Sequence, residues 1–296
     1  MNVLMSIILS LGFTVGGLHY DGIGFAGVAA GTVVAQYSGL LVALLLLLWK
    51  YRRNTLSTVT VSELRGLFKG DETRRFFVMN ADLYVRSLCF IAIYIGFTVI
   101  SARYGDVLLA VSSILMKLLM IFSYFTDGFA YAGEALVGKY IGARDRVKLG
   151  QSIKWTFVWS MGLALLFMGV YHFAGMPMLR MMTSDTSVIE ASSAFLPWLL
   201  LMPPVGCAAF TWDGIFVGAT ASKGLRNSMF WAVVAFVVVW LTGTFCLAFM
   251  VERQTVAPDQ CDGLAMHVLM AAYFAHLLAR TVYLTVKARK SVLSAI

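Results

Sequence analysis

The sequence predicts an all-α polytopic membrane protein with eight transmembrane helices, and two observations lead to this fold class. Of the 296 residues, 60% are hydrophobic and only 13% are charged, with a mean hydropathy of +0.82. A soluble domain of this length is considerably richer in charge. The apolar residues also gather in long segments, and most basic residues lie in alternate loops between those segments. Both patterns are typical of a helical protein that crosses a bilayer several times.

The apolar segments have the length that a membrane-spanning helix requires. About 20 apolar residues cross the hydrocarbon layer as a helix. The first segment lacks the basic start of a cleavable signal peptide, so we interpret it as a spanning helix. The eight expected spans cover residues 2–18, 23–49, 77–101, 107–138, 153–174, 191–219, 229–250 and 264–286.

The loop charges predict the orientation of the chain. With the N-terminus inside, 18 of the 23 Lys and Arg residues fall in inner regions and three in outer loops, while Arg86 and Lys117 lie within spans. The inner group includes Arg226 and Arg280. The positive-inside rule then places both termini in the cytoplasm, in a protein of the plasma (inner) membrane. The net charge of +8 thus follows from topology, and we exclude a nucleic-acid-binding function.

The sequence contains no recognisable catalytic or metal-binding pattern. It has no HExxH, GxSxG or Walker A motif. Its four cysteines form no CxxC pair, so neither a zinc site nor a disulfide framework is expected. We therefore expect no enzyme activity, no metal and no cofactor. Without a nucleotide site, uphill transport must draw on an ion gradient.

A short internal echo indicates how the spans are grouped. An Asp-Gly pair opens both the second and the eighth span, at Asp21 and Asp262. Transporters often repeat a six-helix unit. We therefore expect one complete six-helix C-terminal lobe, preceded by the last two helices of another lobe. The expected parts are a two-helix remnant (1–50), a cytoplasmic linker between the lobes (51–76), the six-helix lobe (77–287) and a cytoplasmic tail (288–296).

One polar stripe follows the fourth expected span. At about 100° per residue, five polar side chains of this span fall within an arc of roughly 100° on an otherwise apolar helix. An ionisable group in hydrocarbon costs several kcal/mol, so the stripe is expected to face a water-filled path or a protein partner. The alternative is an internally satisfied polar cluster. The stripe consists of Lys117, Tyr124, Asp127, Tyr131 and Glu134.

Three further charged residues are candidates for the same pathway. Asp82 and Arg86 are four residues apart in the third span, a spacing that allows an ion pair along one helix. Asp213 follows three prolines in the sixth span, and its Asp-Gly pair repeats that at Asp127. The rise of a helix places both of these aspartates about 15–18 Å from the inner charges, near the bilayer midplane. For each, a purely structural role is the alternative.

Four motifs together carry a family resemblance. They are Gly24–Thr32 (GFAGVAAGT), Asn80–Leu88 (NADLYVRSL), Asp127–Gly142 (DGFAYAGEALVGKYIG) and Trp212–Ala219 (WDGIFVGA), and they are spread over most of the chain. In order and spacing they resemble the multidrug and toxic compound extrusion (MATE) family, nearest its DinF-like branch.

The resemblance implies a twelve-helix transporter of two six-helix lobes, of which this chain corresponds to the fifth through twelfth helices. Such proteins export cationic or amphipathic small molecules by antiport with sodium or protons. The C-lobe acids that can be carried over are Asp82, Asp127, Glu134 and Asp213. The coupling aspartate of the first helix has no counterpart, so we expect an incomplete form that does not transport alone.

Two other functions remain open on the sequence. One is a flippase for lipid-linked sugars from the same superfamily, which is expected to have a more basic cavity. The other is an inactive truncated membrane remnant. In each case the expected partner is the lipid bilayer, joined by a small-molecule substrate if the protein transports.

Overall fold

The computed structural model describes residues 2–15, 18–51, 70–254, 257 and 260–294. Its contacts divide the chain into two units, Met1–Arg74 and Arg75–Ile296. The assignment of these units to two transporter lobes remains a prediction. The proposed linker, 51–76, lies mostly outside the described residues.

The first unit contains two helices and a short hairpin. Helix α1 (Asn2–Leu11) packs against α2 (Phe25–Tyr51), and strands β1 (Gly12–Val15) and β2 (Leu18–Asp21) pair in antiparallel register between them. The contact between the helices is close because α2 presents glycine there. A Cβ added at Gly27 would lie 2.2 Å from the Leu9 carbonyl oxygen. Small residues allow this kind of approach between membrane helices.

The first expected span differs from the structure. Residues 2–18 do not form one long helix, because α1 ends at Leu11 and Gly12 begins a strand with φ at +78°. Glycine adopts this left-handed conformation readily, whereas other residues do not. Ten helical residues extend only about 15 Å, roughly half of the hydrocarbon thickness. Seven described helices, rather than eight, are long and apolar enough to cross a membrane.

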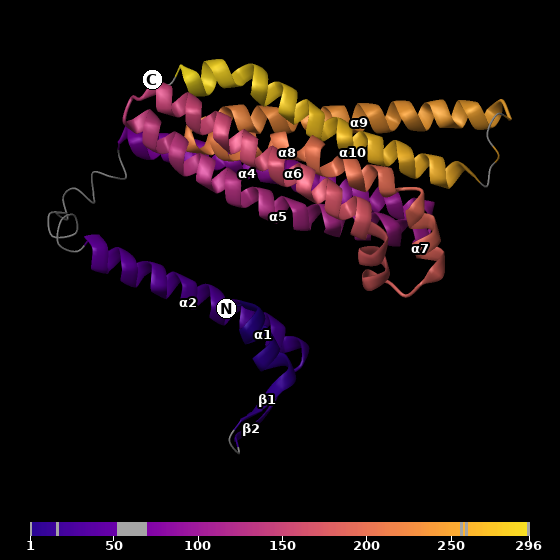
Figure 1. The fold of residues 1–296 in the computed structure, drawn as a ribbon, viewed down its shortest axis with the longest axis horizontal. Helices are drawn as coiled ribbons and strands as arrows, with labels where there is room; N and C mark the ends of the chain where they lie inside the picture. The colour runs from indigo at the N-terminus through magenta and orange to yellow at the C-terminus, as the bar shows by residue number, and fades with distance from the viewer. Residues whose placement is uncertain (1, 16–17, 52–69, 255–256, 258–259, 295–296) are drawn as a thin grey trace. The chain divides into compact units, whose positions relative to one another are not determined.

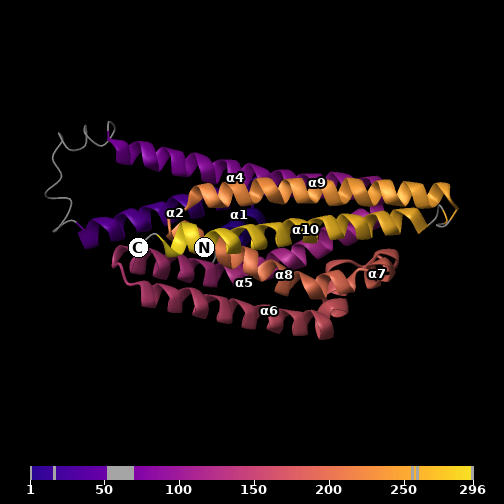
Figure 2. The same cartoon turned by 90° about the horizontal axis from the view of Figure 1, so that it is seen from above.

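The second unit is an all-helical bundle of long, apolar helices (Figures 1 and 2). Neighbours in the bundle include α5 with α8, α6 with α8, and α9 with α10. The elements are α4 (Asp71–Ser101), the 3-10 turn Ala102–Tyr104, α5 (Asp106–Gly142), α6 (Arg146–Met182), α7 (Thr186–Ser193), α8 (Leu196–Gly218), α9 (Ser222–Glu252), α10 (Cys261–Ala288) and the π-turn Arg289–Leu293.

Helix α8 lies at the centre of this bundle. More than half of its most apolar window is buried, against about a tenth for α4 and α9. Pro197 stands in its first turn and Pro203 and Pro204 lie inside it. The expected sixth span began at residue 191, but the helix itself begins at Leu196, after a break that separates it from α7. A buried central helix is where a polar side chain most needs partners, and Asp213 lies on it.

Candidate functional site

The polar stripe lies on the exposed face of α5. Tyr124 and Tyr131 are 65% and 68% exposed, Lys117 is exposed, and Asp127 and Glu134 are half-buried. The opposite face of α5 carries most of the twelve buried residues of this helix. The structure therefore brings the five stripe residues to one face of one helix. Their role in transport stays a prediction.

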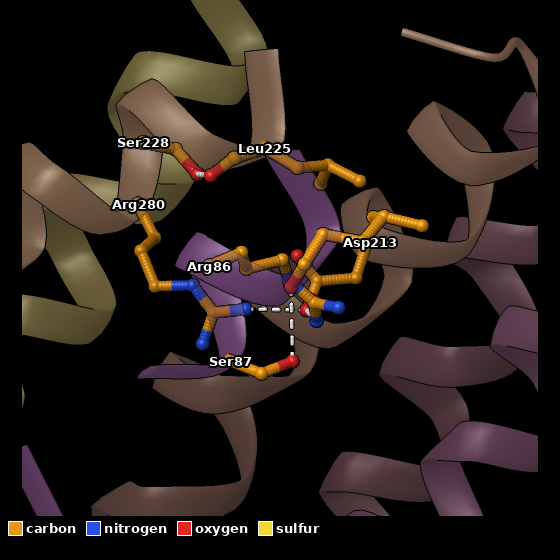
Figure 3. A network of polar contacts seen from close by, with 7 residues as sticks. Arg86, Ser87, Asp213, Leu225, Ser228 and Arg280 are labelled. Carbon is orange, nitrogen blue, oxygen red and sulfur yellow. Dashed lines mark hydrogen bonds and ion pairs between the residues drawn. The ribbon is translucent and has the colours of Figure 1, made fainter. Parts of the chain in front are cut away.

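Asp213 forms polar contacts with two other helices of the bundle. Its Oδ2 accepts a hydrogen bond from Nη2 of Arg86 at 2.5 Å and another from Nη2 of Arg280 (Figure 3). Arg86 belongs to α4 and Arg280 to α10, so three helices meet at one carboxylate oxygen. The Asp213 side chain is 14% exposed and that of Arg280 is 1% exposed. Charges buried this deeply require paired partners.

Asp127 lies close to this cluster but outside it. It interacts electrostatically with Asp213 and with Arg86. No hydrogen bond or ion pair joins its side chain to another described residue. Two arginines and one aspartate carry one excess positive charge, and the Asp127 carboxylate lies near enough to interact with Arg86 and Asp213 of this group. The polar face of α5 and the Asp213 cluster are thereby linked through one unpaired carboxylate.

A very close helix contact fixes α5 against α8 beside this cluster. A Cβ added at Gly214 would lie 2.1 Å from the Ala130 carbonyl oxygen, and one at Gly218 would lie 2.3 Å from that of Glu134. The glycine next to Asp213 thus permits close approach, as membrane helices often require. The glycine next to Asp127 does not serve this purpose, since a Cβ at Gly128 would meet no atom within 4 Å.

The expected ion pair between Asp82 and Arg86 is not observed. Asp82 instead accepts hydrogen bonds from Nη1 of Arg226 at 2.6 Å and from the Ser222 hydroxyl at 2.9 Å, both on α9. Asp82 is buried, whereas Arg86 turns to Asp213. The spacing of four residues only permits a pair within one helix. Partners on neighbouring helices are preferred here because Asp82 is buried and Asp213 is largely buried away from water.

Comparison with known proteins identifies the family of this bundle. The family model described as MatE matches residues 83–245, more than half of the chain. The chain belongs to the MatE family. Members of this family are membrane transporters rather than enzymes, and the seven long apolar helices agree with an integral membrane protein.

Individual relatives support the same assignment. The chain is 35% identical to DNA damage-inducible protein F of Escherichia coli (strain K12) over 239 residues, which are 81% of this chain and 50% of that protein. It is 24% identical to Protein DETOXIFICATION 42 of Arabidopsis thaliana over 155 residues, 51% of this chain and 28% of that protein. The chain therefore spans about half the length, or less, of these relatives.

A solved structure has the same fold. "Crystal structure of MATE in the bent conformation" matches with a TM-score of 0.61 and 14% identity, over 75% of this chain and 46% of that chain. At this identity the likeness concerns the fold alone.

Sequence reasoning missed three partners of the buried aspartates: Arg280, which pairs with Asp213, and Arg226 and Ser222, which donate to Asp82. Arg280 was assigned to an inner region, but it lies within α10 and is almost completely buried. Its position inside the expected span 264–286 was the available signal. Arg226 and Ser222 gave no such signal, because both stand at the start of α9 beside ordinary loop residues. The matched family region begins just after Asp82 and ends before Arg280.

The cluster retains polar atoms that could bind a further group. Oδ1 of Asp213 and Nε and Nη1 of Arg280 have no hydrogen-bond partner among the described residues. The same part of the chain contains no group of three or more His, Cys, Asp or Glu side chains placed to hold a metal ion.

Proposed function

We propose that this chain forms part of a secondary transporter that exports cationic or amphipathic small molecules in exchange for sodium or protons. The observation that carries the proposal is Asp127, a half-buried carboxylate without an ion pair among the described residues, beside Asp213 and the arginines that hold it inside an apolar bundle. Ionisable groups within membrane segments are costly and mark substrate or ion pathways by default. Membership of the MatE family supports a transporter.

In the proposed path, the Asp213 cluster lies on one side and the polar face of α5 lies on the other. Tyr124 and Tyr131 offer exposed aromatic surface for an amphipathic or cationic substrate. Asp127 lies between this face and the Asp213 cluster, where it is without an ion pair. A cation or proton that binds at Asp127 neutralises a carboxylate that interacts with Asp213 and Arg86. In this proposal, that change couples ion binding to the contact between α4 and α8.

We propose that the transporter lies in the plasma membrane with both termini in the cytoplasm, an orientation that requires the segment before α2 to cross the bilayer together with the seven long helices. The inner regions of the expected topology still hold 17 of the 23 basic residues when Arg280 is removed from the 18 assigned there. This asymmetry supports the orientation, because the rule counts residues in short loops near the ends of the spans.

The flippase alternative receives less support from the site. A flippase for lipid-linked sugars needs basic groups that are free to bind pyrophosphate. Arg86 and Arg280 both donate to the Asp213 carboxylate, and Arg226 donates to Asp82. Each of these guanidinium groups already donates to a carboxylate, whereas Asp127 and Glu134 on the α5 face have no ion-pair partner among the described residues. An exporter of cations fits this charge distribution better.

Equilibrium binding tests the proposal without requiring transport by the chain alone. The chain in lipid nanodiscs is titrated with radiolabelled tetraphenylphosphonium, a lipophilic cation, at varied sodium concentration and pH. We expect saturable binding that sodium or protons weaken, and a loss of about tenfold in affinity for Asp127→Asn. Asp106→Asn, at the exposed first turn of the same helix, is the matched control and should bind normally.

Two outcomes would contradict the proposal. If Asp127→Asn and Asp213→Asn both bind the cation as the unchanged chain does, the assigned pathway is wrong. If a lipid-linked pyrophosphate binds where tetraphenylphosphonium does not, the flippase reading replaces the exporter.

A further inference from the structure

An apolar groove runs between α9 and α10 on the outside of the bundle. The two helices lie side by side along much of their length (Figures 1 and 2). The groove has a volume of about 460 Å³. Its lining includes Trp231, Ala279 and Val282 and is apolar almost throughout, with Lys287 as the one charged residue. This groove is distinct from the Asp213 cluster and has no part in the proposed transport path.

The charged end of the groove is cationic and unpaired. Lys287 lies in the last turn of α10, is exposed, and forms no ion pair with another described residue. Arg289 and Lys290 of the following π-turn are also exposed, but they are not among the described residues that line the groove. Trp231 and Tyr283 line the same groove. Aromatic rings beside basic residues are characteristic of the level at which lipid headgroups meet the hydrocarbon.

Charge, rather than apolar surface, must determine what binds there. In a bilayer the surrounding acyl chains are as apolar as the groove, so burial of a chain in it favours no lipid over another. A basic side chain at the headgroup level attracts an anionic lipid by about fivefold in affinity for each charge. We propose that this groove binds one anionic phospholipid, with an acyl chain along Ala279 and Val282 and its phosphate at Lys287.

A second groove of almost the same size serves as an internal comparison. It lies between α6 and α8, has a volume of about 470 Å³, and is also almost entirely apolar. Its lining includes Gly169, His172 and Leu200, and no Lys or Arg is among the described residues that line it. The proposal therefore requires that this groove show no preference for an anionic headgroup. The two grooves have nearly the same volume, but only the groove between α9 and α10 has a Lys among its described lining residues.

Native mass spectrometry of the purified chain tests this directly. The chain in detergent is titrated with dioleoylphosphatidylglycerol and, separately, with dioleoylphosphatidylcholine, which has the same acyl chains and a neutral headgroup. We expect the first adduct of the anionic lipid to form about fivefold more tightly. Lys287→Gln should abolish that preference, and Lys287→Arg should retain it. Because Lys287 is exposed at a helix end, neither change should disturb folding.

A pair of groove-filling variants locates the site. Ala279→Leu fills the groove between α9 and α10 and should remove the preferential adduct. Gly169→Leu fills the other groove, where an added Cβ meets no atom within 4 Å, and should leave the preference intact. Equal binding of the two lipids overturns the proposal, as does a preference that survives Lys287→Gln or that both filling variants reduce alike. None of these outcomes depends on transport.

Discussion

Asp127 and Asp213 each precede a glycine in the membrane-spanning part of a long helix, but their surroundings differ in almost every respect. Asp213 is largely buried, shares one oxygen with two arginines, and stands beside a glycine that touches the neighbouring backbone. Asp127 is half-buried and unpaired, and the glycine beside it faces open space. The comparison separates two tasks of a membrane carboxylate. One fastens helices together, and the other remains available to a ligand.

The largest expected effect comes from removal of the buried arginine. Arg280→Met leaves Asp213 with only the partly exposed Arg86, and breaking a buried pair in this way costs about 3–5 kcal/mol of folding free energy. Arg86→Met should cost less, because Asp213 then keeps its deeper partner. Reversible unfolding in mixed detergent and dodecyl sulfate micelles measures both. Equal losses for the two variants would contradict the central position of Arg280.

The next largest expected effect is the difference in stability between substitutions at Gly214 and at Gly128. Gly214→Ala forces α8 away from the Ala130 carbonyl and should destabilise the chain by about 1–3 kcal/mol through overpacking. Gly128→Ala adds a methyl group in open space and should leave stability unchanged or raise it by up to about 1 kcal/mol. The same unfolding assay compares them. A similar loss for both would mean that the two glycines have one role.

Neutralising the unpaired aspartate should separate stability from binding. Asp127→Asn removes no ion pair, so its unfolding free energy should stay within about 0.5 kcal/mol of the unchanged chain. Asp213→Asn, in contrast, leaves two arginines without their carboxylate and should unfold far more easily. Parallel measurement of unfolding and of tetraphenylphosphonium binding distinguishes the two variants. An unstable Asp127→Asn variant would place this residue with the fastening group instead.

The smallest expected effect on stability concerns Asp145, an aspartate outside the membrane. Asp145 caps α6, and the hydrogen bond from the Lys148 backbone N–H holds the pKa of its carboxyl below the ordinary value of 3.8. Its stabilising contribution is therefore complete above that value and is lost as the pH falls through the lower pKa of the folded state. Asp145→Asn should show a shallower loss of thermal stability below about pH 4. If the unchanged chain and Asp145→Asn lose thermal stability identically as the pH falls, the cap is not a cause of that loss.

The sequence predicted the parts of this fold that depend on composition and periodicity. Long apolar runs located α2 and each of the long helices of the bundle, and a 3.6-residue period placed Lys117 and Tyr124 on one face of α5. These features are local, so a single segment contains the information. The failure at residues 2–18 has a local cause as well. Hydropathy counts apolar residues, but it does not register that Gly12 ends the helix.

The partners of the charged residues could not be predicted in the same way. Asp82 and Arg86 are adjacent on one helix, but each pairs with a residue more than 120 positions away. These pairings depend on which helices pack together, and a local sequence pattern does not encode that packing. The echo between Asp127 and Asp213 suggested equivalent roles for the same reason. Local sequence is alike at the two sites, whereas the neighbouring helices are not.

The three-helix junction at Asp213 also has a consequence for biosynthesis. Arg86 precedes Asp213 by 127 residues, and Arg280 follows it by 67. When the ribosome has just delivered α8 to the membrane, Arg86 is therefore already present, while α10 has not yet been made. The carboxylate can enter the bilayer beside Arg86 of α4, so Asp213 need not be inserted without a partner. Arg280 completes the junction only when α10 arrives, so the pairing of Asp213 with both arginines must wait for that helix.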